Sequence, residues 1–169
     1  LFLDNHALCN ITESLVFTDP YYNAELNHHN PVVDDVVKDL RQNIKLKAEA
    51  QVLLTKFVAN SETMLHGDLH TGSVMCTEES IRVIDPEFAT YGPMGFDLGM
   101  MLANLVMAYI SQPAHRKPED LSSYQGWILT VMKDLVTAFQ EEFSKLWHSE
   151  RQGVLFPKSL FEDQEQAAS

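Results

Sequence analysis

Apolar residues recur every three or four positions along two long stretches of the chain, and this spacing predicts two amphipathic helices. The first covers about residues 32–59, with a kink allowed within it, and the second covers about residues 118–148. Asn30 and Pro31 mark the start of the first helix, because asparagine favours the N-cap and proline the first helical position. We expect the basic face of the first helix to be solvated and the apolar stripe of the second to pack in a core.

A third stretch, about residues 95–111, is apolar on nearly all sides, which is typical of a helix buried at the centre of a domain. Between the first and third helices the pattern changes to short apolar runs at 73–76 and 81–84, separated by the polar turn 78–80. This arrangement predicts a β-hairpin, with Asp85 continuing the Ile81 face at the end of its second strand. The sequence therefore predicts a mainly α protein with one small β-hairpin.

The composition narrows the class of protein. Of 169 residues, 45% are apolar, which is enough for the core of one domain. The formal charge of −12 disfavours nucleic acid as a partner, since that needs a basic surface for the phosphates. The run 98–110 is too short to cross a membrane. Cys9 and Cys76 are the two cysteines, and we expect buried, reduced thiols in a cytoplasmic protein.

Candidate chemistry lies between residues 64 and 97. Asp68 follows an apolar segment and has a histidine on each side, and Asp85 and Glu87 follow the hairpin, with Pro86 fixing the bend between them. Separate carboxylates at such turns suit a metal–phosphate site, because hard oxygen ligands select Mg²⁺. The sequence predicts a metal-dependent active site in this segment.

Two strings in this segment, HGDLHTGS and VIDPEFATYGPMGFD, closely resemble the methylthioribose kinases. This group is part of the protein-kinase-like small-molecule kinases, which include the aminoglycoside and choline phosphotransferases. His66-Gly67-Asp68 stands where protein kinases have H-R-D, and Asp85-Pro86-Glu87 stands where they have D-F-G. The resemblance implies the C-terminal lobe of a kinase-like fold and an ATP-dependent phosphorylation of 5-methylthioribose to 5-methylthioribose 1-phosphate, a step of methionine salvage.

The resemblance also implies roles for individual residues. Asp68 would be the catalytic base and would contact the sugar substrate. Asp85, Pro86 and Glu87 would form the nucleotide-binding turn, with Asp85 and Glu87 holding Mg²⁺ and the phosphates of ATP.

Other residues in the segment would have supporting roles. Asp97 would brace the catalytic loop by accepting its backbone N–H groups, and His66 and His70 would also support it. Ser73 stands where the wider superfamily has a metal-binding asparagine. This difference leaves undecided whether a second metal ion is bound, and it makes Glu87 the more important metal ligand.

The chain has no initiating methionine, no glycine-rich loop and no strand lysine that would hold ATP. We therefore expect residues 1–169 to be a partial kinase-like C-terminal lobe, with its catalytic loop and metal-binding hairpin at 64–97. The N-terminal nucleotide lobe and the sugar-contacting arginines of the family would lie outside it, so the isolated fragment would have little kinase activity. A homodimer is a family expectation.

Three alternatives remain open at this point. The protein could be another aminoglycoside- or choline-type phosphotransferase. The run Gly67–His70 also matches the G-D-x-H element of metallophosphoesterases, in which His66, Asp68 and His70 would be ligands of a dinuclear metal site. A pseudokinase or helical interaction module, with solvated carboxylates, is the non-enzymatic alternative.

Overall fold

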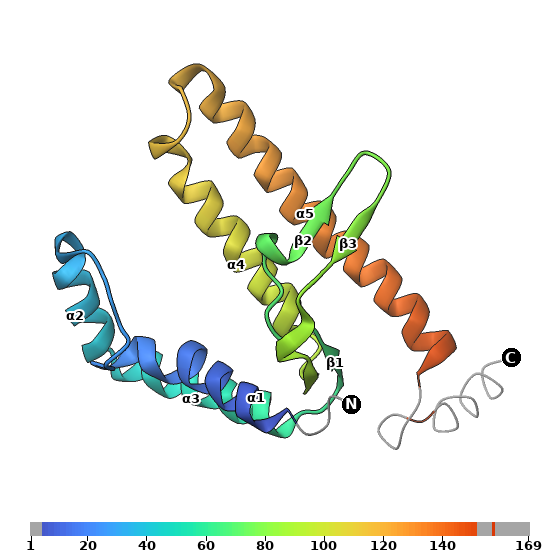
Figure 1. Ribbon diagram of the computed structural model, residues 1–169, viewed down its shortest axis with the longest axis horizontal. Helices are drawn as coiled ribbons and strands as arrows, with labels where there is room; N and C mark the ends of the chain where they lie inside the picture. Colours follow the sequence, from blue (N-terminus) through green and yellow to red (C-terminus); the bar gives the residue numbers. More distant parts are fainter. Residues whose placement is uncertain (1–4, 152–156, 158–169) are drawn as a thin grey trace, which may run out of the picture. The chain divides into compact units, whose positions relative to one another are not determined.

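The computed structural model describes residues 5–151 and residue 157. The chain divides into two compact units between Met107 and Ala108, inside helix α4. All four strands of the described chain belong to the first unit (Figure 1). The helical elements of the first unit are α1 (His6–Thr12), the π-helix η1 (Glu13–Thr18), the 3-10 turns η2 (Asp19–Tyr21), η3 (Pro31–Val33), η4 (Thr71–Ser73) and η5 (Pro86–Phe88), α2 (Asp34–Gln42), α3 (Ile44–Ala59) and the greater part of α4 (Phe96–Ser111).

The long helix predicted over 32–59 is two helices. Asn30 is the predicted N-cap and accepts a hydrogen bond from the Val32 amide at 3.0 Å, but the first turn is 3-10 and α2 begins at Asp34. Asn43 leaves the helical conformation at ψ 90° and its side chain caps α3 by accepting from the Leu46 amide at 3.0 Å. An asparagine that can cap a new helix thus ends α2 and begins α3, although the apolar spacing continues across it.

The predicted hairpin is present. Strand β2 (Val74–Cys76) pairs antiparallel with β3 (Ile81–Val83), with Val74 opposite Val83 and Cys76 opposite Ile81. The Thr77 hydroxyl closes the turn by accepting from the Ser80 amide at 3.0 Å. Both cysteines are free, but Cys76 is exposed, so the prediction of a buried thiol there is wrong. In the described chain no further strand joins this pair, so both of its edges stay unpaired, and five of its six strand residues are exposed.

A second antiparallel pair, not predicted from the sequence, joins β1 (Thr63–Leu65) to β4 (Thr90–Gly92). Leu65 lies opposite Thr90, and Thr63 lies opposite Gly92. A Cβ on Gly92 would lie 2.6 Å from Cδ1 of Leu65, so glycine lets this buried leucine pack directly on the neighbouring strand.

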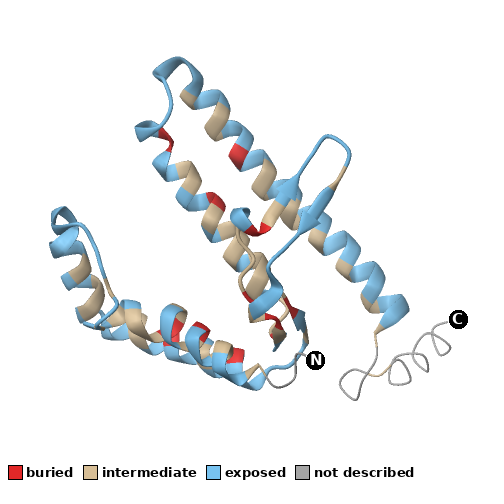
Figure 2. Cartoon of the chain, in the orientation of Figure 1, coloured by how far each residue is buried: buried red, intermediate tan, exposed pale blue. Residues whose placement is uncertain are grey.

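The core of the first unit is aromatic and lies beside the predicted catalytic segment. Phe17, Phe57 and Leu65 are buried together, and Phe96 packs against them. Figure 2 draws buried positions in red, and they are few along each helix. The ring centroids of Phe57 and Phe96 are 4.8 Å apart and those of Phe17 and Phe57 are 5.4 Å apart. Such pairs contribute about 0.5–1.5 kcal/mol each beyond their burial. Since Leu65 precedes His66 and Phe96 precedes Asp97, this core fixes both residues' positions in the fold.

Helix α4 is less buried than its composition predicts. Leu105 is buried, whereas Met107 is 61% exposed and Ile110 68% exposed. An apolar helix is buried only where other elements cover it, and the described part of the chain leaves this face open. The prediction of a helix buried on all sides is therefore wrong for the chain as described.

The second unit holds the end of α4, the 3-10 turn η6 (Gln112–Ala114) and the long helix α5 (Pro118–Glu150), which matches the helix predicted over 118–148. The Arg116 guanidinium lies 3.6 Å from the Tyr124 ring centroid, and the Gln125 side chain donates to the Tyr109 carbonyl at 3.1 Å. Ile128 is buried, but Leu146, at the end of the predicted core stripe, is exposed.

The mainly α class with a small antiparallel hairpin is confirmed. Among the described helices, none is both long enough and apolar enough to cross a membrane.

Candidate functional site

The loop after β1 is fixed by the first turn of α4. The Asp97 carboxylate accepts hydrogen bonds from the backbone N–H of His66 at 2.6 Å and of Gly67 at 3.0 Å. Hydrogen bonds to a charged acceptor are the stronger kind, and two of them on adjacent amides define the orientation of the peptide between them. The aromatic core, in which Phe96 packs against Phe57, thus positions Asp97, and Asp97 positions the loop.

Gly67 brings this loop into direct contact with the η5 turn. Its φ of 84° is in the left-handed region, which glycine adopts without steric cost. A Cβ at this position would lie 2.1 Å from the Phe88 carbonyl oxygen and 2.7 Å from its carbon. No other residue fits here unless one of the two backbone segments moves.

The His66 ring joins the loop to the end of β3. Its Nε2 donates to the Ile84 carbonyl at 2.8 Å, and its Nδ1 accepts from the Asp68 amide at 3.4 Å, so these partners assign the ring proton to Nε2. Both ring nitrogens are therefore engaged by backbone groups. This argues against the alternative in which His66 is a ligand of a dinuclear metal site.

Asp68 combines a fixed backbone with an accessible carboxylate. Its amide is held by His66, and its carbonyl accepts from the Ser73 hydroxyl at 2.9 Å. The side chain is 44% exposed, and its nearest charged or titratable partner in the described chain is His70 Nε2, 3.6 Å from Oδ2. A base that must reach a substrate hydroxyl needs this combination of rigid support and open access.

Two further side chains hold the remainder of the loop. Ser73 is 3% exposed and its carbonyl accepts from the Ile84 amide at 2.9 Å, so it links the loop to the end of β3 in addition to bonding Asp68. Asn104 of α4 accepts hydrogen bonds from both the amide and the hydroxyl of Thr71. Sequence reasoning missed Asn104, although a lone amide within the apolar run 98–108 is a signal that could have found it.

Asp85 and Glu87 lie on a sharp turn immediately after β3. The strand ends at Val83, so Asp85 does not continue the Ile81 face as predicted; it adopts a left-handed conformation (φ 65°, ψ 53°) and Pro86 opens η5. Aspartate tolerates this region better than most residues, and strained backbone of this kind clusters at functional sites.

The turn is supported from the N-terminal end of the chain. The Asn5 side-chain amide donates to the carbonyls of Glu87 at 2.8 Å and of Ala89 at 2.9 Å, a contact that the sequence did not indicate. Within residues 5–151, the carboxylates of Asp85 and Glu87 have no hydrogen-bond or ion-pair partner. Two exposed carboxylates with free oxygens fit Mg²⁺, which binds through one or two carboxylates together with phosphate oxygens. No group of three or more acidic, histidine or cysteine side chains suited to a metal occurs in the described residues.

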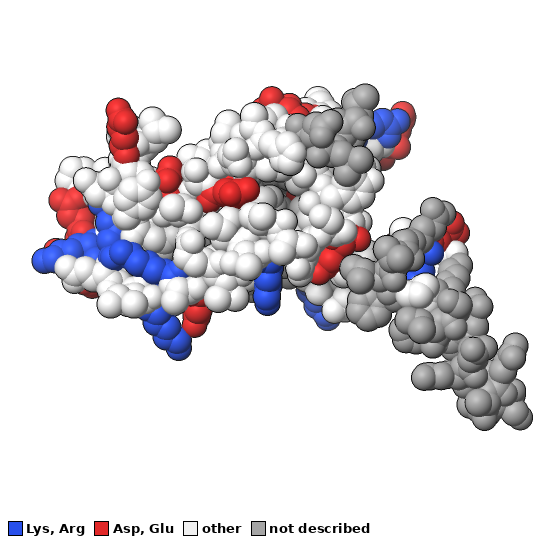
Figure 3. Space-filling model, turned by 90° about the horizontal axis from the view of Figure 1, so that it is seen from below, with Lys and Arg blue, Asp and Glu red and all other residues white. Residues whose placement is uncertain are grey.

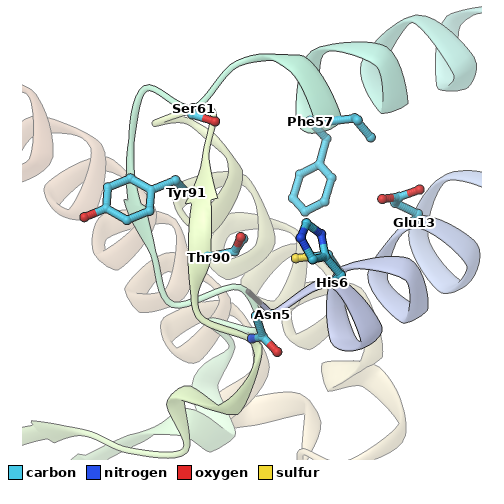
Figure 4. A pocket seen from close by; sticks show the side chains of 9 residues that line it. Asn5, His6, Glu13, Phe57, Ser61, Thr90 and Tyr91 are labelled. Atoms are coloured by element: carbon cyan, nitrogen blue, oxygen red, sulfur yellow. The ribbon is translucent and has the colours of Figure 1, made fainter. Parts of the chain in front are cut away.

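A separate cavity of about 230 Å³ lies between α1, the end of α3 and β4, and none of the predicted site residues lines it. Figure 4 shows the rings of His6 and Phe57 pointing toward each other across it, with Glu13 at one side. On the face drawn in Figure 3, acidic and basic side chains are interspersed, and no broad basic surface covers the part that is visible.

Comparison with known proteins shows which family model and which relatives the chain matches. A family model described as "Phosphotransferase enzyme family" matches residues 4–128. Methylthioribose kinase 1 of Oryza sativa subsp. japonica is 42% identical over 154 residues, which cover 90% of this chain and 36% of the relative. The methylthioribose kinase of Escherichia coli O45:K1 (strain S88 / ExPEC) is 40% identical over 163 residues, covering 95% of this chain and 39% of the relative.

A third relative, the methylthioribose kinase of Geobacillus sp. (strain WCH70), is 41% identical over 145 residues, which cover 86% of this chain and 34% of the relative. The chain thus spans less than two fifths of the length of each of these relatives.

Proposed function

We propose, since the chain belongs to the phosphotransferase enzyme family, that the complete protein is an ATP-dependent kinase of 5-methylthioribose. It transfers the γ-phosphoryl group of ATP to the 1-hydroxyl of the sugar, a step of methionine salvage in the cytoplasm. The observation that supports this most is the loop network in which His66, Asp97 and Ser73 fix the backbone around Asp68 and leave its carboxylate accessible. The relatives named methylthioribose kinase support the choice of sugar.

Asp68 acts as the general base in this proposal. Its carboxylate accepts the proton of the sugar hydroxyl as the hydroxyl oxygen bonds to the γ-phosphorus and the bond from phosphorus to the β,γ-bridging oxygen breaks, so that ADP leaves with the electron pair. Positioning is the main contribution of the protein to such a transfer. The two hydrogen bonds from Asp97 to the loop provide it by fixing the peptide that precedes Asp68.

Asp85 and Glu87 are the residues that would hold Mg²⁺, with Pro86 fixing the turn that presents them to the phosphates. When bound, the ion supplies positive charge that neutralises the transferred phosphoryl group. Gly67 and His66 tie the base loop to both flanks of this turn, at Phe88 and Ile84. The base and the metal ligands therefore belong to one connected backbone unit.

In this proposal residues 64–97 supply the catalytic loop and the metal-binding turn of a kinase-like C-terminal lobe, and the rest of the complete protein supplies the remaining contacts to ATP and sugar. A homodimer is part of the same proposal, because it is expected of the family.

The test uses the complete protein in an assay that couples ADP release to a spectroscopic signal, with methylthioribose, ribose, choline and an aminoglycoside as acceptors. We expect turnover with methylthioribose well above that with the other three. Asp68→Asn keeps the shape of the side chain and removes its basicity, so kcat should fall by about 10²–10⁴-fold with the circular dichroism spectrum unchanged. Asp39→Asn, at an exposed aspartate of α2, is the matched control.

Wild-type turnover by Asp68→Asn would remove Asp68 from the role of base. Equal turnover of all four acceptors, or a clear preference for choline or the aminoglycoside, would contradict the proposed sugar. ADP release that does not depend on any acceptor would contradict the kinase.

A further inference from the structure

His70 lies two residues after Asp68 on the same loop, and its contacts define the tautomer of the neutral ring and the direction in which the ring points. Its Nδ1 accepts a hydrogen bond from the Gly72 amide at 3.0 Å. The neutral ring therefore carries its proton on Nε2, and it is Nε2 that lies 3.6 Å from Oδ2 of Asp68.

The ring has little freedom to turn away from Asp68. A Cβ on Gly72 would lie 2.7 Å from Cε1 and 2.9 Å from Nδ1 of His70, so the glycine backbone lies directly against the edge of the ring. Thr71, between the two, is held by Asn104 of α4. A small residue at 72 and an anchored residue at 71 keep the donor in place.

We propose that His70 is a positioning residue for Asp68: its Nε2–H holds Oδ2 and leaves the other carboxylate oxygen, Oδ1, to accept the proton of the substrate hydroxyl. This inference rests on the proposed function, because Asp68 must be the base. At 3.6 Å the contact is longer than a hydrogen bond, and catalytic hydrogen bonds are often long in the free protein and shorten when substrate binds. Both side chains are a little over two fifths exposed, so both are accessible where the substrate would bind.

A purely structural role is the competing explanation, because accepting from the Gly72 amide caps the η4 turn. Two substitutions separate the roles. Asparagine places its oxygen where Nδ1 lies, so His70→Asn keeps the cap and its short amide does not reach the position of Nε2. Glutamine places an amide N–H near Nε2, so His70→Gln keeps the donor and loses the cap.

The experiment measures kcat and KM of the complete protein for both variants, with His28→Asn, at an exposed histidine, as the control. We expect His70→Asn to lose about 10- to 100-fold in kcat, since a small misplacement of the base has this effect, with KM for sugar and for ATP within about twofold of wild type. His70→Gln should recover most of the loss. Wild-type kcat in His70→Asn, or equal losses in the two variants, would overturn the proposal.

A readout that does not depend on activity separates this inference from the proposed function. In protein labelled with ¹⁵N-histidine, Asp68→Asn should shift the Nε2 resonance of His70, and Asp39→Asn should not. An unchanged resonance overturns the contact between His70 and Asp68, whichever acceptor the enzyme uses. Wild-type protein that phosphorylates none of the acceptors, together with a shifted resonance, would contradict the proposed function and retain the pairing of the two side chains.

Discussion

Gly67→Ala is the substitution for which the structure predicts the largest local effect. The added methyl would lie 2.1 Å from the Phe88 carbonyl oxygen, more than about 1 Å closer than carbon and oxygen approach even in C–H···O contacts. The obstacle is backbone on both sides, so a side-chain rotation cannot relieve it. The φ of 84° is a second obstacle, because alanine adopts this region at a cost.

The two costs set the expected magnitude. A left-handed conformation costs an alanine roughly 1–2 kcal/mol, and forcing a methyl into a packed site costs typically about 1–3 kcal/mol. We therefore expect a loss of about 2–5 kcal/mol in the free energy of unfolding of this region. Because Asp68 is the next residue, a shift of about 1 Å in the loop should also lower kcat/KM by roughly 100-fold.

The measurement compares thermal unfolding and steady-state kinetics of the complete wild-type protein and the variant. Gly99→Ala is the matched control, since the residue is inside α4 and a Cβ built there meets nothing within 4 Å apart from its chain neighbours and the backbone of its own helix. Alanine at a helical position is favoured over glycine by about 0.5–1 kcal/mol, so the control should be neutral or slightly more stable. Wild-type stability and turnover in Gly67→Ala would refute the close packing of the loop on the η5 turn.

Two more predictions follow from the same network. In Asp97→Asn, the side-chain NH₂ group would face one of the two backbone N–H donors, of His66 or Gly67, and cannot accept its hydrogen bond. The free energy of unfolding of the complete protein, measured by chemical denaturation, should therefore fall by about 1–3 kcal/mol. An unchanged denaturation midpoint would argue against the bracing role of Asp97. Asp85→Ala should raise the Mg²⁺ concentration needed for half-maximal activity while the fold, followed by circular dichroism, stays intact; an unchanged Mg²⁺ dependence would remove Asp85 from the metal site.

Elements defined by neighbouring residues could be predicted from the sequence. The hairpin of β2 and β3 follows from alternation around a polar turn, and its two strands are only four residues apart. The pairing of β1 with β4 could not be predicted, because three-residue strands separated by 24 residues carry no periodic signal of their own. Asn43 was missed as a break because the apolar spacing continues on both sides of it.

In the site, too, some residues could be predicted from the sequence and others could not. Asp68, Gly67 and Asp85 could be predicted, because a carboxylate or a glycine directly after a short apolar run is a signal that the sequence itself shows. The supports at Asn5 and Asn104 act over 82 and 33 residues, and nothing in the sequence near them indicates which backbone groups they bind. Exposure was the least predictable property, since burial of Cys76 or of the outer face of α4 depends on which elements cover them.

The loop from His66 to Ser73, the proposed catalytic loop, is held in place by residues that are synthesised after it. Asp97 follows His66 by 31 residues, and Asn104 follows Thr71 by 33. At a synthesis rate of about 5–20 residues per second, the loop emerges from the ribosome a few seconds before the residues that order it. During that interval the Asp97 and Asn104 contacts are missing, so the loop around Asp68, the proposed base, can reach its final geometry only when α4 has formed. A chain that ended before Asp97 would keep the full HGDLHTGS string and lose the carboxylate that orders its first two residues.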